Sequence, residues 1–123
     1  MNPKRQLVGK EYDVMSVVWD EGGRVPARRV HEVLSKRGTD RAETYQLIHR
    51  CIGKGYLERE EPDFVCHALI DRETIQVEET KRLVDRMFGG SAERLLVSLV
   101  DTKSTSQEEI GRLRALIKDV YQE

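Results

Sequence analysis

The sequence predicts a mainly α-helical protein with one small β-hairpin, followed by a C-terminal helical unit. Three observations indicate this. Apolar side chains recur every three or four residues in six segments, which is the spacing of amphipathic helices. Residues 56–70 read instead as two short strands joined by a turn. The last segment carries an apolar seam typical of helices that pair with other helices. Three helices followed by a hairpin is the order of a winged helix-turn-helix domain.

Length and composition limit the possible classes of protein. A chain of 123 residues supports one domain, or one small domain plus an assembly element. The net charge is −1, but residues 1–61 hold 12 Lys and Arg against 10 Asp and Glu, so this half is the better candidate to meet an anion. We find no membrane-spanning run and no signal-peptide core. Cys51 and Cys66 do not suggest a disulfide framework, so we expect a cytoplasmic protein.

The first two predicted helices are short and amphipathic. The first covers residues 10–21, with an apolar stripe of Tyr12, Met15, Val18 and Trp19. The second begins at Pro26, a residue favoured at the first helical position, and places Val30, Val33 and Leu34 on one face. Arg28 lies on its outer side, where it is either solvated or in contact with a phosphate.

The third predicted helix begins after Asp40, because Asp40 and Glu43 have the spacing of a capping box. One side is apolar and consists of Thr44, Leu47, Ile48, Cys51 and Ile52. The other side is polar and mildly basic, with hydrogen-bonding groups of the kind that read base edges in a major groove. The alternative interpretation is an ordinary amphipathic helix with a solvated outer face.

Residues 35–39 form a tight, glycine-containing connection between the second and third helices, the layout of a helix-turn-helix. In that motif the second helix enters the groove and its first half contacts bases. Gln46 suits adenine, and Arg50 suits guanine or a phosphate. Tyr45 suits a phosphate or the methyl group of thymine, and His49 suits a phosphate. The predicted DNA contacts are Arg28, Arg41, Tyr45, Gln46, His49, Arg50, Lys54 and Arg59.

The hairpin consists of a strand over residues 56–59, a turn at 60–63 and a returning strand from Phe64 to Ile70. We therefore place a winged-helix DNA-binding domain at residues 1–70 and a helical dimerisation domain at 71–123. The hairpin turn is acidic, and only Arg59 opposes the acidic side chains.

Three helices are predicted in the C-terminal unit, capped by Asp71, Ser91 and Ser106. Helices of this size bury little apolar surface alone, so we expect a second copy of the chain to cover their apolar faces. The alternative is packing onto the winged helix of the same chain. The predicted dimer interface consists of Leu95, Leu96, Leu99, Val100, Ile110, Leu113, Ile117 and Val120.

Other chemistry has little support in the sequence. Cys66 and His67 could join His31, His49 or Cys51 around a metal, but no ligand spacing supports such a site. The chain has no phosphate loop and no nucleophile–base or paired-carboxylate motif in a recognisable context. We therefore expect no enzyme activity, no cofactor and no metal.

With these elements placed, the sequence resembles the BlaI/MecI family of penicillinase repressors over nearly its whole length. The resemblance is carried by residues 11–19 (EYDVMSVVW), by Arg50 with residues 54–57 (KGYL), by 87–92 (MFGGSA) with Leu95, and by 106–110 (SQEEI) with Leu113. The family's usual Thr-Val/Ile-x-Thr run is replaced by residues 43–46 (ETYQ), so the operator sequence is not carried over.

The resemblance implies a dimeric transcriptional repressor that binds a palindromic operator of double-stranded DNA and controls β-lactam-resistance or related genes. In the best-known systems a membrane sensor-protease cuts the dimerisation helices, at a position where this chain has Ser98-Leu99. The competing hypothesis is a winged-helix module for protein–protein interaction, favoured by the acidic turn.

Overall fold

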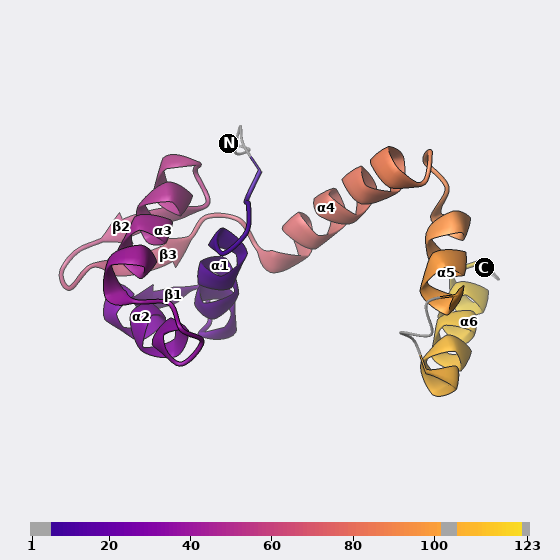
Figure 1. Ribbon diagram of the computed structural model, residues 1–123, viewed down its shortest axis with the longest axis horizontal. Coiled ribbons are helices and arrows are strands. Elements are labelled where there is room, and N and C mark those ends of the chain that lie inside the picture. Colours follow the sequence, from indigo (N-terminus) through magenta and orange to yellow (C-terminus); the bar gives the residue numbers. More distant parts are fainter. Residues whose placement is uncertain (1–5, 102–105, 122–123) are drawn as a thin grey trace. The chain divides into compact units, whose positions relative to one another are not determined.

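A computed structural model describes residues 6–101 and 106–121, with side chains as far as Lys118. Along the chain the elements are α1 (Glu11–Asp20), β1 (Arg24–Pro26), α2 (Ala27–Ser35), α3 (Arg41–Gly53), β2 (Leu57–Glu60), β3 (Val65–Ala68), α4 (Arg72–Met87), α5 (Ala92–Asp101) and α6 (Gln107–Tyr121) (Figure 1). Contacts divide the chain into two compact units, and the boundary between them along the sequence lies between Gln76 and Val77.

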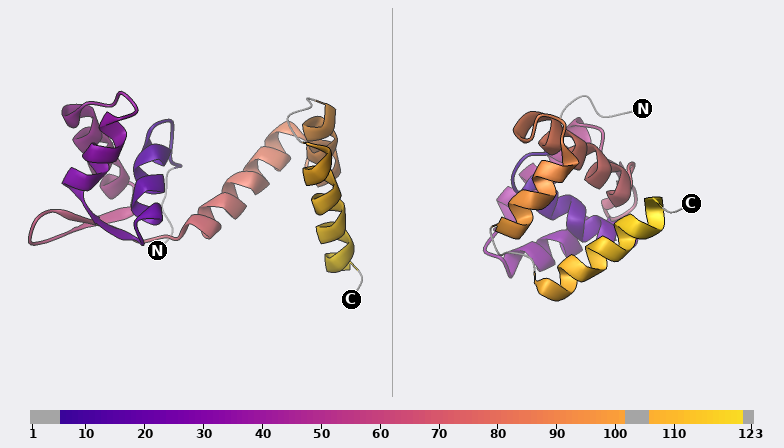
Figure 2. Two further views of the ribbon diagram at one scale, coloured as in Figure 1. Left: turned by 90° about the horizontal axis from the view of Figure 1, so that it is seen from below. Right: turned by 90° about the vertical axis from the view of Figure 1, so that its right-hand side faces the viewer.

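The first unit is a winged helix, which confirms the predicted fold class. The helices α1, α2 and α3 pack around a core that also includes one face of a three-stranded antiparallel sheet. The strand order is β1-β3-β2, so β3 is central. The turn between β2 and β3 extends past α2 and α3 (Figures 1 and 2).

The core of this unit follows from the apolar periodicity of the sequence. Each helix gives one face to it, and the sheet gives alternate residues, as expected for strands with one buried side. The fully buried side chains include Val14, Met15 and Val18 of α1, Val30 and Leu34 of α2, Ile48 and Cys51 of α3, and Leu57 and Cys66 of the sheet.

The strand β1 was not predicted. Pro26 was expected to be the first helical residue, but it ends β1 and serves as the N-cap of α2, with extended backbone angles (φ −61°, ψ 144°). Because β1 is an edge strand, a proline that cannot donate a hydrogen bond is tolerated there. The chain reaches β1 through Gly22 and Gly23, whose positive φ values (93° and 94°) turn the backbone after α1.

Trp19 belongs to the predicted apolar stripe and anchors the end of α1, since its half-buried ring packs against the core and its Nε1–H donates to the Ile70 carbonyl (2.9 Å). The next helix, α4, is capped by Asp71, whose Oδ1 accepts from the Thr74 amide (2.8 Å). Its first turn contributes the buried Ile75 to the winged-helix core.

The second unit consists of the rest of α4 together with α5 and α6. Both predicted caps are confirmed: Ser91 Oγ accepts from the Arg94 amide (3.2 Å) and Ser106 Oγ from the Glu109 amide (3.1 Å). No helix in the described part of the chain is long and apolar enough to cross a membrane.

Candidate nucleic-acid interface

The helix α3 begins where the sequence predicted. Asp40 has an extended backbone (φ −76°, ψ 174°), and its Oδ1 accepts from the Glu43 amide (2.8 Å). This bond satisfies one of the amide groups that the first helical turn leaves without a partner. The Glu43 carboxylate pairs with Lys10 Nζ (3.1 Å), so α1 and α3 are also linked at this end.

The predicted inner face of α3 is confirmed, because Thr44, Leu47, Ile48 and Cys51 are all buried. Burial of these side chains fixes the rotation of the helix about its axis. The opposite face is exposed and presents Gln46, His49 and Arg50. These three positions lie within one arc of a helix with 100° per residue, so their polar groups point to the same side.

An aromatic contact joins this outer face to the hairpin. Phe64, the residue before β3, lies against Tyr45 with ring centroids 5.7 Å apart and against His49 with centroids 5.8 Å apart. Both separations fall in the range of favourable aromatic pairs. The Arg41 guanidinium lies 5.0 Å from the centre of the Tyr45 ring. Phe64 was not among the predicted site residues, because its contacts depend on how the hairpin turns back.

Lys54 does not lie on the outer face. Its Nζ donates to Glu11 Oε1 (2.6 Å) and to the Gln6 carbonyl (2.9 Å), and its side chain is only 13% exposed. Glu11 is buried and also accepts from the Val8 amide (2.9 Å). Burial raises the pKa of Glu11, but hydrogen bonds from Lys54 and Val8, together with nearby positive charge, outweigh it and lower the pKa overall.

Two further predicted basic residues, Arg28 and Arg59, differ in whether another side chain already compensates their charge. Arg59 is exposed on β2, but it pairs with Glu61 and lies 3.9 Å from the centre of the Phe64 ring. Arg28 is exposed on α2 and has no ion-pair partner among the described residues. Arg28 therefore retains a charge for an external anion, whereas the charge of Arg59 is compensated within the hairpin.

Both cysteines lie in the core. Burial raises the pKa of the Cys51 thiol to about 12 and that of the Cys66 thiol to about 11. Such thiols remain protonated at neutral pH and are weak nucleophiles. Cys66 and His67 are neighbours on a strand, so their side chains point to opposite faces of the sheet. This orientation argues against the metal site considered from the sequence, in which Cys66 and His67 would bind the same ion.

The second unit exposes several apolar side chains of α5 and α6. Within α5, all of whose residues are described, no side chain is buried. Of the predicted interface residues, Leu99, Val100 and Ile117 are exposed, Leu95, Leu96, Ile110 and Leu113 are half-buried, and the side chain of Val120 lies outside the described residues. Val97 (52% exposed) and Leu116 (61%) share this exposure, although neither was predicted.

Comparison with known proteins identifies relatives over nearly the whole chain. A family model described as "Penicillinase repressor" matches residues 8–119. The methicillin resistance regulatory protein MecI of Mammaliicoccus sciuri is 22% identical over 118 residues, which cover 94% of this chain and 96% of the relative. The penicillinase repressor of Staphylococcus aureus is 20% identical over 121 residues, which cover 97% of this chain and 96% of the relative.

Proposed function

The chain belongs to the penicillinase repressor family, and we propose that this transcriptional repressor acts as a dimer that binds a palindromic operator through α3. The observation that carries the proposal is the exposed polar face of α3, held in a fixed rotation by its buried opposite face. The family acts by binding and is not a family of enzymes.

The proposed contacts divide into base reading and phosphate binding. Gln46 reads adenine in the major groove and Arg50 reads guanine or binds a phosphate. Tyr45 and His49, supported by Phe64, bind phosphates, as do Arg28 and Arg41. We leave Lys54 and Arg59 out of this set, because Glu11 and Glu61 already compensate their charges.

We propose that residues 1–70 form the DNA-binding domain and 71–123 the dimerisation domain. The exposed apolar side chains of α5 and α6 support this division, because a second copy of the chain would cover them. A dimer places two copies of α3 on half-sites about 10 bp, or a multiple of this, apart.

Release would follow from anything that separates the dimerisation helices, including a cut by a membrane sensor-protease. Ser98 and Leu99 stand at the proposed position of the cut, and Leu99 is 37% exposed. The relatives named for methicillin resistance and penicillinase support β-lactam-resistance genes as the proposed targets.

The test is fluorescence anisotropy with a duplex from the promoter region of the chain's own gene, measured over a salt series. We expect a linear decrease of log K with log salt, with a slope near −0.9 for each phosphate neutralised. Gln46→Ala should cost about 1–3 kcal/mol at particular base pairs and leave binding to random duplex unchanged. Gln76→Ala, an exposed glutamine outside α3, is the matched control.

A second candidate is a winged-helix module that binds a protein, favoured by the acidic side chains of the hairpin, which are Glu58, Glu60, Glu61 and Asp63. The same titration separates the two functions. A promoter duplex bound no better than a random one, with Gln46→Ala indistinguishable from the parent chain, would favour the protein-binding module.

A further inference from the structure

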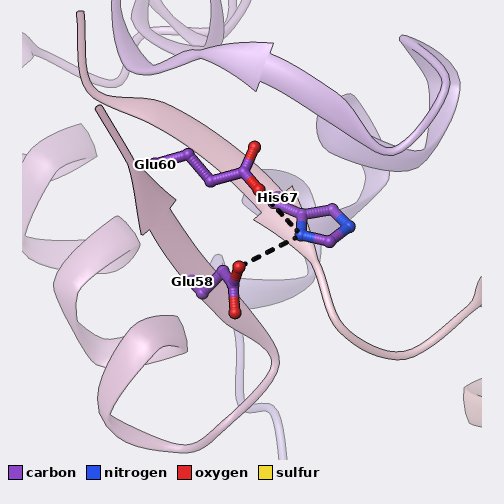
Figure 3. A group of neighbouring side chains, drawn as sticks. All are labelled: Glu58, Glu60 and His67. Carbon is purple, nitrogen blue, oxygen red and sulfur yellow. Dashed lines mark hydrogen bonds and ion pairs between the residues drawn. The ribbon is translucent and has the colours of Figure 1, made fainter. Parts of the chain in front are cut away.

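The face of the sheet that points away from the core carries two carboxylates and one imidazole, from Glu58, Glu60 and His67 (Figure 3). Glu58 lies directly opposite His67 in the pairing of β2 with β3. Glu60 follows two residues later on the same face, and a diagonal separation of this kind is within reach of a long side chain. The strand register therefore brings three possible metal ligands together.

The distances within this cluster differ from those of good hydrogen bonds. Nδ1 of His67 is 3.4 Å from Glu58 Oε1 and 3.4 Å from Glu60 Oε2. Both separations are long for a hydrogen bond, and a single Nδ1–H cannot be well aligned with two acceptors. Ligands that surround a Zn²⁺ ion tetrahedrally at about 2.1 Å are themselves ~3.4 Å apart. The two observed separations match the expected distance between two ligand atoms of such a site.

We propose that Glu58, Glu60 and His67 form a binding site for a divalent transition metal of the Zn²⁺ class. One imidazole nitrogen and two carboxylate oxygens suit zinc, whereas an all-oxygen set would suit calcium or magnesium. All three ligand atoms lie within 4.8 Å of one another. Rotation of the two flexible glutamate side chains would bring their ligand oxygens to the same separation. The fourth coordination position of the metal would face solvent.

One neighbouring residue, Arg24, orients a carboxylate of the cluster and also reduces its negative charge. Arg24 donates from Nε to Glu60 Oε1 (3.0 Å), so the guanidinium holds the carboxylate while Oε2 faces His67. Its Nη2 also approaches Oε2 (3.5 Å), and its charge offsets part of the attraction for a cation. Two carboxylates against one guanidinium leave a net negative cluster. Cys66 takes no part, because it is buried on the other face.

The test uses the untagged full chain, freed of metal by a chelator and titrated with Zn²⁺ in a calorimeter. We expect one Zn²⁺ per chain, with affinity reduced at least tenfold in His67→Gln, Glu58→Gln and Glu60→Gln. His31→Gln and Glu61→Gln are the matched controls, since neither residue belongs to the cluster, and both should bind as the parent chain does. Co²⁺ provides a second probe, because its visible absorption reports four-coordinate geometry.

A thermal scan gives a readout that does not depend on DNA binding. A metal that joins β2 to β3 binds the folded chain and not the unfolded one, so Zn²⁺ should raise the Tm of the parent chain and leave that of His67→Gln unchanged. Circular dichroism without metal checks that the half-buried His67 can be replaced without unfolding. The site is refuted if Zn²⁺ does not bind saturably, or if it binds His67→Gln as tightly as the parent chain.

Discussion

At the scale of single residues, the ion pair between Glu11 and Lys54 holds the segment from Gln6 to Val8 against the winged helix. The Glu11 side chain is 2% exposed and the Lys54 side chain 13%. Removing one partner from such a pair leaves a charge in the core without compensation, which costs more than the pair itself contributes. The pair is therefore a structural requirement, although the sequence predicted Lys54 to be a DNA contact.

Lys54→Met should destabilise the folded chain by about 3 kcal/mol at pH 7, the lower end of the range for broken buried pairs, since Lys54 keeps some exposure. In the parent chain the pKa of Glu11 is lowered, so its contribution is present above the unfolded pKa and is lost as pH falls through the folded one. In the variant burial still raises the pKa of Glu11, while only the Val8 amide and the charge of Arg50 still lower it, so this pKa should be higher than in the parent chain. The difference in unfolding free energy between the two, measured with urea, should shrink on acidification; a constant difference would contradict this.

At the scale of elements, the contact between the hairpin and α3 gives a role to Phe64, which is not among the proposed DNA contacts. Phe64 supports Tyr45 and His49, so Phe64→Ala should release both side chains and weaken operator binding about tenfold, roughly 1.4 kcal/mol. Leu69→Ala, which removes an exposed apolar side chain at the other end of β3, should bind normally. Anisotropy measures both. If Phe64→Ala binds as tightly as the parent chain, the contact does not position the helix.

The elements also show which parts of the structure the sequence could predict. The start of α3 and its two faces depend on residues three or four positions apart, such as Asp40 and Glu43, so local pattern was sufficient. The strand β1 has three residues and ends in Pro26, which is more typical of a helix start. The contacts of Lys54, Phe64 and His67 join distant segments or depend on strand register, which periodicity does not reveal.

At the scale of the whole molecule, the proposed function implies that the two units contribute to DNA affinity in different ways. The winged helix carries the proposed contacts to one half-site, and the exposed apolar side chains of α5 and α6 are proposed to join two copies. Joining two binding modules makes the second binding event intramolecular, which raises affinity by about 10²–10⁴ without a new contact to DNA. Loss of the dimer should therefore weaken binding to a palindrome much more than binding to a half-site.

Val100→Asp tests this separation, because Val100 is 48% exposed on α5 and far along the chain from the proposed DNA contacts. A carboxylate there should oppose association, since an interface core excludes unpaired charge. We expect a monomer by analytical ultracentrifugation and at least a hundredfold loss of affinity for the palindrome. Val100→Thr, of similar shape and uncharged, should remain dimeric. Unchanged binding to a half-site duplex would show that the winged helix is intact, whereas a Val100→Asp dimer would place the interface elsewhere.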